Sequence, residues 1–562
     1  MEQVRDLVSI TFGDLLDQQA KNFPDRDAVV YPHYDLRYTY AQFRDVCNRA
    51  AKGMLAIGIQ KGDHVAIWAT NYPQWLIAMF AAAKIGAVLV TVNTNYKAFE
   101  LEYLMRQSDS MTLLMSDGFK DSHYIDHINA VCPELANSEP GALNSAKLPC
   151  LKNVVYLERH GEEARDISGM FTWEGMLAQS ETISDDTLAV IQASCDPQDV
   201  VNMQYTSGTT GFPKGVMLTH YNVVNNGWSI GDCMKFTEQD RLCIPVPFFH
   251  CFGLVLAITA CVTHASAMVP VEYYRPTWVM EAIQQEKCTA VHGVPTMFIA
   301  ILSRDDLDQY DFSTLRTGIM AGSPCPIEVM KKAVDIMHLT EITSVFGQTE
   351  SSPGMTQTRT DDPLELRVST VGRLLPHCEG KIVDPETHTD CPPNTPGEIV
   401  TRGYHIMKGY YNMPEATAQA IDEEGWLHTG DIGTISDDGY FNITGRLKDM
   451  IIRGGENVYP REIEEFLYTH PAVSDVQVIG VPDKAYGEEI LAYVVPKEGM
   501  DVDVEELKLY VRNGLARHKA PRYIEFIDAF PMTASGKIQK YKLREMAIAR
   551  LSLQEDDAVV TA

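Results

Sequence analysis

The most informative segment of the chain runs from Val200 to His220 and reads VVNMQYTSGTTGFPKGVMLTH. A strand pattern ends at Tyr205, a run rich in glycine and hydroxyl side chains follows, and a second strand pattern leads into a helix near Asn222. Glycines let backbone N–H groups approach phosphate oxygens closely, hydroxyls donate hydrogen bonds, and Lys214 supplies a cation. The segment therefore predicts a phosphate-binding loop between two strands. It differs from a P-loop, because Lys214 is followed by glycine and a strand rather than by Ser or Thr and a helix.

The segments before this loop alternate between helix and strand patterns. They predict a helix over Tyr40–Ile57, a strand over His64–Ala69, a helix over Pro73–Lys84 and a strand over Ala87–Val92. Such alternation is typical of parallel sheets flanked by helices. We therefore expect an α/β protein whose large N-terminal domain holds mixed, mostly parallel sheets.

The second half of the chain changes character twice. Between about Gly372 and Thr444, short β-like runs such as Gly397–Thr401 and Gly439–Ile443 are separated by Gly, Pro and Asp. This region predicts a β-rich subdomain. From Tyr459 to about Arg550 the pattern is mixed again, which predicts a small α+β C-terminal domain.

Composition restricts the partners of this chain. Its 562 residues include 76 acidic and 47 basic side chains, for a formal charge of -29. A field of this sign repels polyanions, so we expect no nucleic-acid partner, and any nucleotide must be held by a local site. The 12 Cys residues form neither a CxxC pair nor a zinc-ligand spacing, which indicates a reducing compartment. The N-terminus shows no signal-peptide pattern, so we expect a cytoplasmic protein.

Two apolar stretches, Trp75–Val92 and Cys251–Val271, are interrupted by polar residues. A membrane-spanning helix needs roughly 20 predominantly apolar residues. Each stretch therefore predicts a buried helix that runs into a buried strand, and we expect no transmembrane segment. The sequence leaves the oligomeric state open, including a homo-oligomer.

The loop pattern is more specific than a glycine-rich turn, because it reads Thr206-Ser207-Gly208-Thr209-Thr210-Gly211-x-Pro213-Lys214-Gly215. It closely resembles the signature of the AMP-forming adenylating enzymes, which comprise acyl-CoA synthetases, adenylation domains of peptide synthetases and firefly-type luciferases. The resemblance extends over most of the chain and implies binding of ATP, Mg²⁺ and a carboxylic acid, with coenzyme A as the acceptor in acyl-CoA synthetases. The loop residues implied to contact ATP are Thr206, Ser207, Gly208, Thr209, Thr210, Gly211 and Lys214, with Thr209 also at the metal.

A second motif reads Phe346-Gly347-Gln348-Thr349-Glu350 and follows a short strand pattern. A carboxylate beside a hydroxyl and an aromatic ring suits a metal ion, a phosphate and a base. The resemblance implies that Glu350 ligates Mg²⁺, that Thr349 contacts the α-phosphate, and that Phe346 stacks on adenine, where relatives usually carry Tyr. Gly347 and Gln348 belong to the same nucleotide motif.

Further residues extend the predicted nucleotide site. Asp431 can accept hydrogen bonds from both ribose hydroxyls, and Arg446, 15 residues later, can bridge ribose and phosphate. A surface salt bridge is the alternative for this pair. The resemblance assigns Asp431 and Arg446 to the ribose, and Gly322 and Ser323 to a turn beside adenine.

The C-terminal part resembles the mobile lid of the same family, with Lys448 at the hinge position. The implied domains are a large adenylating domain over 1–447, with its β-rich subdomain at about 372–447, a lid over 448–550 and a tail over 551–562. Gly454 and Gly455 are implied to line the path of the pantetheine arm of CoA. A plain interdomain turn is the alternative for these two glycines.

The segment Pro531-Met532-Thr533-Ala534-Ser535-Gly536-Lys537 matches the family pattern Pro-x-Thr-x-x-Gly-Lys. The resemblance implies that Lys537 is catalytic. Its ammonium would stabilise negative charge between the attacking carboxylate and the α-phosphoryl group.

The segment Pro247-Phe248-Phe249-His250-Cys251-Phe252-Gly253 resembles the wall of the acyl pocket, with His250 near the carboxylate. An apolar turn that holds a satisfied histidine is the alternative. No Asp lies between Pro245 and Ala257, where relatives that activate amino acids commonly place one, so an uncharged acyl chain is favoured. The residues predicted to line the pocket are Phe248, Trp228, Gly231, Gly293 and Pro295.

The favoured function is an ATP-dependent, AMP-forming ligase that joins a carboxylic acid to CoA through an acyl-adenylate. The expected acid is a medium- or long-chain fatty acid, or a branched, alicyclic or aryl acid. One alternative is an adenylating enzyme that loads a carrier protein or oxidises the adenylate. The other is a non-catalytic nucleotide-binding protein.

Overall fold

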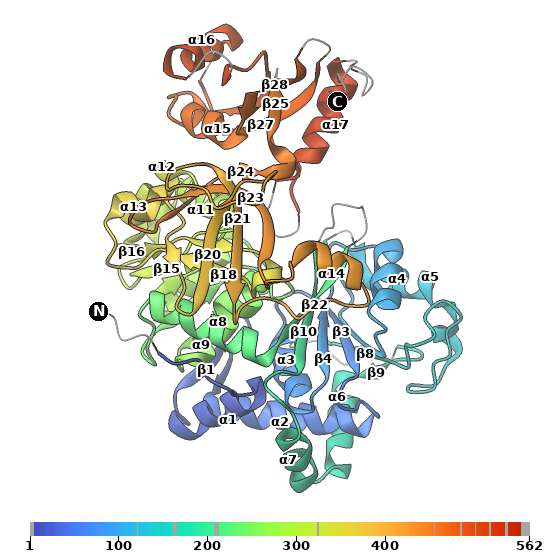
Figure 1. The fold of residues 1–562 in the computed structure, drawn as a ribbon. Helices are drawn as coiled ribbons and strands as arrows, with labels where there is room; N and C mark the ends of the chain where they lie inside the picture. Colours follow the sequence, from blue (N-terminus) through green and yellow to red (C-terminus); the bar gives the residue numbers. More distant parts are fainter. Residues whose placement is uncertain are drawn as a thin grey trace.

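The computed structural model describes most of the chain as a large N-terminal body with a small C-terminal domain at one end (Figure 1). The described residues are 5–120, 122–159, 161, 165, 167–206, 213–322, 325–453, 456–483, 486–500, 502–515, 519–533, 538–551 and 553. At positions 448, 456 and 457 only the backbone is described.

One sheet of the large body is almost entirely parallel. Its described strands follow the order β16-β15-β14-β12-β13-β1-β2, and only the pairing of β1 with β2 is antiparallel. The strands are β1 (Asp27–Tyr31), β2 (Leu36–Thr39), β12 (Arg241–Ile244), β13 (Ala267–Pro270), β14 (Ala290–Val291), β15 (Thr317–Ile319) and β16 (Glu341–Thr343). Parallel neighbours need crossover helices, which here are α10 (Pro276–Glu286), α11 (Pro295–Leu302) and α12 (Ile327–Met337).

The second sheet carries the predicted nucleotide loop. Its described strands follow the order β22-β11-β10-β4-β3-β5-β8-β9. They are β3 (His64–Trp68), β4 (Val88–Thr91), β5 (Thr112–Met115), β8 (Asn153–Tyr156), β9 (Phe171–Thr172), β10 (Val200–Thr206), β11 (Lys214–Thr219) and β22 (Gly409–Tyr410). The strand β11 runs antiparallel to both β10 and β22, whereas β10 is parallel to β4.

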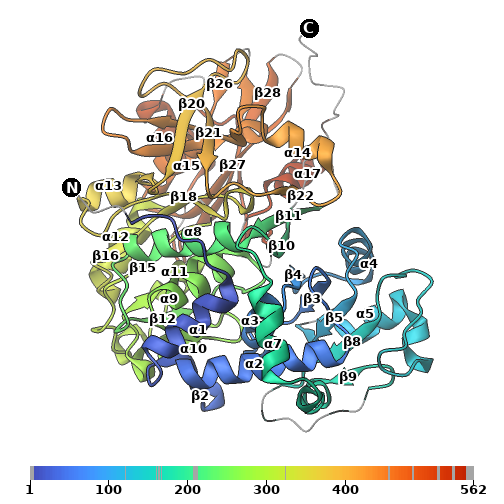
Figure 2. The same ribbon diagram turned by 60° about the horizontal axis from the view of Figure 1, so that its bottom comes forward.

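Helices form layers between and outside these two sheets (Figure 2). The largest core cluster unites buried side chains of both sheets with those of α1 (Phe12–Asn22), α2 (Tyr40–Ala56), α3 (Pro73–Lys84), α8 (His220–Cys233) and α9 (Ala260–Thr263). The helices α10 to α12 cover the other face of the first sheet, and α4 (Ala98–Gln107) and α5 (Tyr124–Val131) cover the other face of the second. Near α2 and α3 lie α6 (Trp173–Ala178) and α7 (Asp185–Ala193).

The last part of the large body is β-rich, as predicted. A small antiparallel sheet contains β17 (Val345–Gly347), β18 (Gly354–Gln357) and β19 (Arg373–Leu374), and a second contains β20 (Cys378–Val383), β21 (Gly397–Gly403), β23 (Leu427–Ile435) and β24 (Phe441–Arg446). The helices of this part are α13 (Leu364–Ser369) and α14 (Pro414–Ala420).

The C-terminal domain is a mixed sheet with three helices in its described residues. Its strands are β25 (Ile451–Arg453), β26 (Glu456–Val458), β27 (Val473–Asp483), β28 (Gly487–Pro496) and β29 (Tyr523–Phe526). Its helices are α15 (Pro460–Tyr468), α16 (Val504–Gly514) and α17 (Lys540–Leu551). Arg461 of α15 donates from Nη1 to the carbonyl oxygen of Ile443 in β24 at 3.0 Å. This hydrogen bond ties the small domain to the β-rich part of the large body.

The predicted fold class is confirmed, and the local predictions are close. The helix Pro73–Lys84 has the predicted bounds, since Pro73 begins it in a position where a missing N–H carries no cost. The stretch Cys251–Val271 runs through a π-helix (Phe252–Thr259) and α9 into β13 and is buried apart from a half-buried His264, as predicted. Among the described residues no helix is long and apolar enough to cross a membrane.

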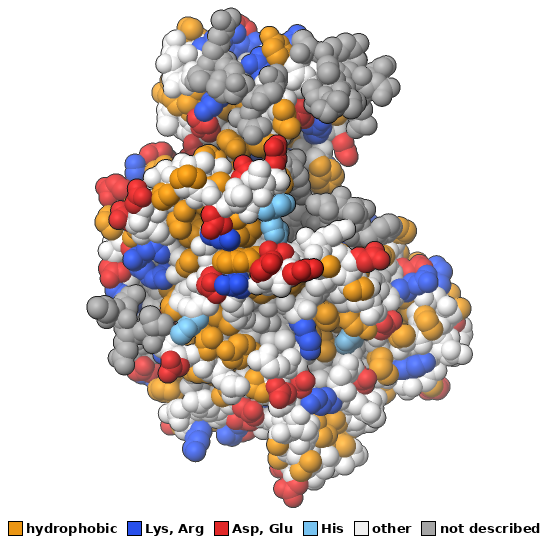
Figure 3. All heavy atoms as spheres, viewed as in Figure 1, with side chains coloured by type: hydrophobic (Ala, Val, Ile, Leu, Met, Phe, Trp, Pro, Cys, Tyr) orange, Lys and Arg blue, Asp and Glu red, His pale blue; other side chains and the backbone are white. Residues whose placement is uncertain are grey.

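Charge is spread over the surface without one dominant sign on the face shown in Figure 3. Acidic and basic side chains alternate there, and the outline narrows where the C-terminal domain meets the larger body. This distribution agrees with a chain whose nucleotide site is local rather than a wide basic surface.

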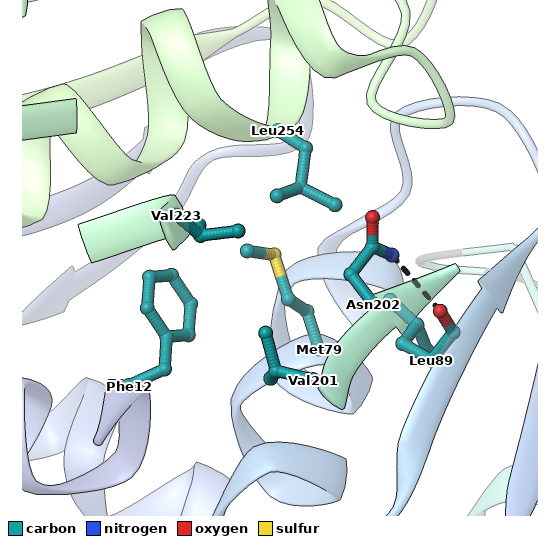
Figure 4. Close-up of a pocket in the computed structure, with 7 residues that line it drawn as sticks. All are labelled: Phe12, Met79, Leu89, Val201, Asn202, Val223 and Leu254. Carbon is teal, nitrogen blue, oxygen red and sulfur yellow. Dashed lines mark hydrogen bonds between the residues drawn. The ribbon is translucent and has the colours of Figure 1, made fainter. Parts of the chain in front are cut away.

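A small internal cavity of about 10 Å³ lies in the main core (Figure 4). It is lined by Phe12, Met79, Leu89, Val201, Asn202, Val223 and Leu254. Asn202 donates from Nδ2 to the carbonyl oxygen of Leu89 at 2.9 Å. The cavity is close to the smallest size that can hold one water molecule, so it is a packing defect and not the substrate site.

Gly318 of β15 tests how tightly neighbouring strands of the first sheet are packed. It has φ +150°, and a Cβ there would lie 1.9 Å from the carbonyl oxygen of Val291. We expect Gly318→Ala to destabilise the protein by about 3 kcal/mol because backbone must move to admit the methyl group. The control is Gly439→Ala, since Gly439 has φ +80° but nothing within 4 Å of its Cβ position. Gly439→Ala should lower the free energy of unfolding by only about 1 kcal/mol. Equal shifts of the two urea midpoints would contradict this prediction.

Candidate active site

The hairpin of β10 and β11 presents the predicted phosphate loop. Thr206 ends β10 directly opposite Lys214, the first residue of β11. The five loop residues between them that were predicted to contact ATP, Ser207, Gly208, Thr209, Thr210 and Gly211, lie outside the described residues. Because β4 and β10 are parallel neighbours, the loop leaves the carboxyl end of the sheet, where ligands of α/β proteins commonly bind.

Glu350 lies beside this hairpin, in a short 3-10 helix, η6 (Thr349–Ser351), and is 9% exposed. Its Oε1 accepts a hydrogen bond from Thr206 Oγ1 at 3.2 Å and another from the Tyr410 hydroxyl at 2.9 Å. Lys214 Nζ lies 4.5 Å from the centroid of the Tyr410 ring. The structure therefore brings together three residues that the sequence predicted, Thr206, Lys214 and Glu350, and adds Tyr410.

The surroundings of Glu350 fit a magnesium ion. Within the described part of the chain no lysine or arginine pairs with this buried carboxylate, and both of its donors are neutral. A buried carboxylate is costly unless a cation or metal accompanies it. The described residues contain no cluster of three or more metal-ligating side chains. One carboxylate is nevertheless enough for Mg²⁺, which commonly takes its other ligands from substrate phosphates and water.

Thr349 connects this carboxylate to the predicted acid-binding segment. Its Oγ1 lies 3.5 Å from Cys251 Sγ, which in turn lies 3.6 Å from His250 Nδ1. The backbone N–H of Phe252 donates to His250 Nδ1 at 3.2 Å. A neutral His250 therefore carries its proton on Nε2. Thr349 and His250, predicted from separate motifs, share a contact through Cys251.

Strand ends of the first sheet surround this segment. Gly293 follows β14 and forms an isolated parallel bridge with Met320, and Pro295 begins α11. Gly322 follows β15 with φ +91° and lies against Val294. Carboxyl ends of adjacent parallel strands meet at one edge of a sheet, so Gly293, Pro295 and Gly322 lie along the same edge.

His292 secures this edge from inside the core. Its Nδ1 accepts from the backbone N–H of Ile319 at 3.1 Å, and its Nε2 lies 3.0 Å from the carbonyl oxygen of Leu256 in the π-helix. Burial lowers the pKa of His292 to about 4. The ring is therefore neutral at pH 7 and donates from Nε2, which joins β15 to the π-helix that follows His250.

Three of the residues predicted to line the acyl pocket contact other side chains of the large body. Phe248 has no exposed surface, and its ring packs against Trp75 at 5.4 Å. On α8, a Cβ at Gly231 would lie 2.4 Å from the His264 ring, and Trp228 lies under the Arg5 guanidinium and beside His264. His264 and Arg5 thus lie against these two residues of α8. Their place in an acyl pocket stays a prediction.

The two residues predicted to hold the ribose form an ion pair with each other, and their contact with ribose stays a prediction. Asp431 in β23 and Arg446 in β24 are direct cross-strand partners, with Arg446 Nε 3.1 Å from Asp431 Oδ1. Asp431 is buried, whereas half of the Arg446 side chain is exposed. Phe346 is half-buried and packs against the core of the β-rich part. Its contact with adenine stays a prediction.

Several predicted residues cannot be placed in detail. Ser323, Gly454, Gly455 and Lys537 lie outside the described residues, and of Lys448 only the backbone is described, within the 3-10 helix η7 (Leu447–Asp449). The residues on either side of the Lys537 segment, Met532 and Ile538, form an isolated antiparallel bridge.

Sequence reasoning missed the asparagines of α8. Asn226 is fully buried, and it accepts from the Gly354 N–H at 3.0 Å and donates to the Gly354 carbonyl oxygen at 2.7 Å. Asn222 donates to the carbonyl oxygens of Tyr404 and Ile406. Both segments that these asparagines hold adjoin Glu350. Gly354 follows η6, and Met407, the residue after Ile406, donates its N–H to the Glu350 carbonyl oxygen at 2.9 Å. Several asparagines in one helix are unusual, since Asn is a poor helix former, and this was the available signal.

Comparison with known proteins agrees with this geometry. The family model of the AMP-binding enzymes matches residues 16–411, and that of the AMP-binding enzyme C-terminal domain matches residues 462–537. YngI of Bacillus subtilis (strain 168), provisionally named as an acyl-CoA synthetase, is 56% identical over 548 residues, covering 98% of this chain and 99% of YngI. The mitochondrial medium-chain acyl-CoA ligase ACSF2 of Homo sapiens is 39% identical over 553 residues, covering 97% of this chain and 89% of ACSF2.

A solved structure shares the whole fold. The crystal structure of the anthranilate CoA ligase AuaEII in complex with anthranoyl-AMP matches with a TM-score of 0.84 at 25% identity. The match covers 97% of this chain and 98% of that chain.

The hydrogen bonds of Asn226 predict an effect on the metal site that ordinary destabilisation does not give. We expect Asn226→Leu to reduce magnesium-dependent ATP–pyrophosphate exchange about 10-fold or more, because partners that orient a metal ligand typically have that effect. The matched control is Asn225→Leu. Asn225 clamps the backbone N–H and carbonyl oxygen of Val8 in the same way. Asn225→Leu should lower the melting temperature by a similar amount. It should change the rate of ATP–pyrophosphate exchange by no more than about twofold at a temperature where both variants are folded. Equal losses of exchange would contradict the assignment.

Proposed function

Because the chain belongs to the AMP-binding enzymes, we propose that it joins a carboxylic acid with an uncharged, medium-length acyl chain to coenzyme A. The enzyme is an AMP-forming acid–CoA ligase that uses ATP, Mg²⁺ and CoA. The single observation that carries the proposal is the meeting of Thr206, Lys214 and Glu350 at the carboxyl end of β10. This arrangement offers a cation and a metal ligand to the phosphates of one nucleotide.

The choice of acid rests on the segment around His250. Between Pro245 and Ala257 the chain holds no acidic side chain that could pair an ammonium group. His250 is half-buried among apolar neighbours, with its Nε2–H on the ring edge away from Phe252 N. We propose that this N–H orients the substrate carboxylate and that the acyl chain extends along the strand ends near Gly293. The named activity of ACSF2 favours medium chain length.

The first half-reaction forms an acyl-adenylate. A carboxylate oxygen of the acid bonds to the α-phosphorus of ATP, and the bond to the bridging oxygen of pyrophosphate breaks. Lys214, the loop residues Ser207 to Gly211 and Thr349 hold the phosphates, and Lys537 stabilises charge at the α-phosphoryl group. Glu350 would hold Mg²⁺, which would supply positive charge near the leaving pyrophosphate. Asp431 and Arg446 hold the ribose hydroxyls. Positioning and electrostatics supply most of the rate in such transfers.

The second half-reaction forms the thioester. The CoA sulfur bonds to the acyl carbon, the bond to the AMP oxygen breaks, and the thiol proton is lost to solvent. We propose that the C-terminal domain turns about Lys448 between the two steps, so that Gly454 and Gly455 replace Lys537 beside the adenylate. The place of Lys448 in η7, between β24 and β25, supports a hinge there. Lid movements of this kind commonly complete one site after another.

The compartment is a separate part of the proposal. The 12 cysteines all lie in the described residues and form no disulfides, and eight of them are buried. Free thiols are typical of reducing compartments, which supports a cytoplasmic enzyme. Whether the enzyme forms a homo-oligomer is a matter for sedimentation measurements.

The substrate class predicts a specific profile of AMP release. We expect turnover to require CoA and to be highest with medium-chain acids such as octanoate, lower with acetate and palmitate, and absent with leucine, whose ammonium lacks a partner. Benzoate and cyclohexane carboxylate test the aryl and alicyclic alternatives. AMP release that is indifferent to CoA would replace the ligase by an enzyme that loads another acceptor.

Lys537 predicts a separation of the two half-reactions. We expect Lys537→Ala to lower adenylate formation by about 10²–10³, the usual effect of removing one preorganised electrostatic donor. Thiolysis of supplied acyl-adenylate by CoA should be nearly unchanged, because Lys537 has then left the site. Lys542→Ala is the control, since Lys542 is an exposed lysine of the same segment. Equal losses in both half-reactions would rule out the proposed rotation.

A further inference from the structure

Tyr410 sits where two charged residues of the site would otherwise meet. It belongs to β22, which pairs with β11 so that Tyr410 lies opposite Val216, and it is 7% exposed. Its backbone N–H donates to Thr417 Oγ1 at 2.9 Å. The ring is thus held by strand pairing and by a side chain of α14, and its position does not depend on a bound ligand.

The phenol and the ring face of Tyr410 have different partners. The hydroxyl donates to Glu350 Oε1 at 2.9 Å, and Lys214 Nζ lies 4.5 Å from the ring centroid. A cation above an aromatic face is attracted by the electrons of the ring without being paired with a counter-charge. Tyr410 therefore keeps the ammonium near the carboxylate without neutralising it.

The Tyr410 hydroxyl acts as a hydrogen-bond donor in this contact, because its partner is a carboxylate oxygen, which accepts. With Thr206 on the same oxygen, Glu350 Oε1 accepts two hydrogen bonds from neutral hydroxyls, which orient the carboxylate.

We propose that Tyr410 is a positioning residue for Mg·ATP: its hydroxyl presents the Glu350 carboxylate to the metal, and its ring holds Lys214 at the phosphates and off that carboxylate. The inference rests on the proposed roles of Glu350 and Lys214 in the ligase. It goes further, because it makes one side chain from β22 responsible for keeping both charges available.

Two substitutions separate the two contacts. Tyr410→Phe keeps the ring and removes the hydroxyl, so the metal affinity should fall about 10-fold while affinity for metal-free ATP stays within twofold. Tyr410→Leu also removes the ring, so Lys214 can pair with Glu350, and affinity for metal-free ATP should fall as well. The matched control is Tyr411→Phe, because the neighbouring Tyr411 hydroxyl donates to Asp109 Oδ2 at 3.0 Å instead.

The experiment measures Mn²⁺ binding to the full-length protein by electron paramagnetic resonance, with α,β-methylene ATP as an unreactive nucleotide and no acid or CoA. Metal-free nucleotide affinity is measured by calorimetry in EDTA. Wild-type affinity for Mn²⁺ in Tyr410→Phe would overturn the inference. If Tyr410→Phe does not fold, Thr206→Val replaces it in the test, because this variant removes the other donor to Glu350 Oε1. Thr206→Val should also weaken Mn²⁺ binding. Unchanged Mn²⁺ binding would overturn the inference.

The same measurement separates failure of this inference from failure of the proposed function. If wild-type protein fails to bind Mn²⁺ with the nucleotide, the ligase proposal itself is wrong. If wild-type binds and turns over but Tyr410→Phe matches it in Mn²⁺ affinity, only the role of Tyr410 is wrong. A loss of kcat in Tyr410→Phe that saturating Mg²⁺ restores would support the proposed role, whereas a loss that persists at saturating Mg²⁺ would contradict it.

Discussion

Glu350 places a carboxylate in an environment where 9% of the residue is exposed and where only neutral donors meet it among the described residues. Desolvating a carboxylate costs several kcal/mol even after the protein relaxes. Two hydrogen bonds offset part of this cost, and a cation would offset the rest. A metal at the proposed site would therefore stabilise Glu350, and the hydrogen bonds around this carboxylate are the constraint on which the site depends.

Three segments that are distant in sequence come together around Glu350. Thr206 comes from the end of β10, Glu350 from η6, and Tyr410 from the short strand β22, which pairs with β11 at the edge of the sheet. The helix α8 follows β11 directly and holds the η6 region through Asn226. The strands that flank the predicted phosphate loop and the carboxylate proposed to bind the metal are thus attached to one hairpin and its helix. Movement of β10 and β11 would shift both together, which would keep the proposed phosphate and metal contacts in register.

Local patterns in the sequence predicted the elements well because they report local physics. Pro73 at a helix start and the unbroken apolar run behind it identify a buried helix without reference to the rest of the chain. Asp431 and Arg446 could be named because both lie in recognisable motifs, and the structure shows that they are partners in an ion pair. The sequence did not show that His264 lies against Gly231 and Trp228, because that contact joins two separate segments of the chain.

The sequence by itself determined the fold class and the family, and it predicted the chemistry of the nucleotide site. These are carried by contiguous motifs whose glycines, hydroxyls and charges act through the nearby backbone. Only the tertiary structure decided that Glu350 is buried without a cation in the described chain, and that Tyr410, 60 residues away, supplies its second hydrogen bond. Burial and side-chain hydrogen bonds of this kind depend on sheet register and on the approach of separate strands. No local spacing encodes those distances.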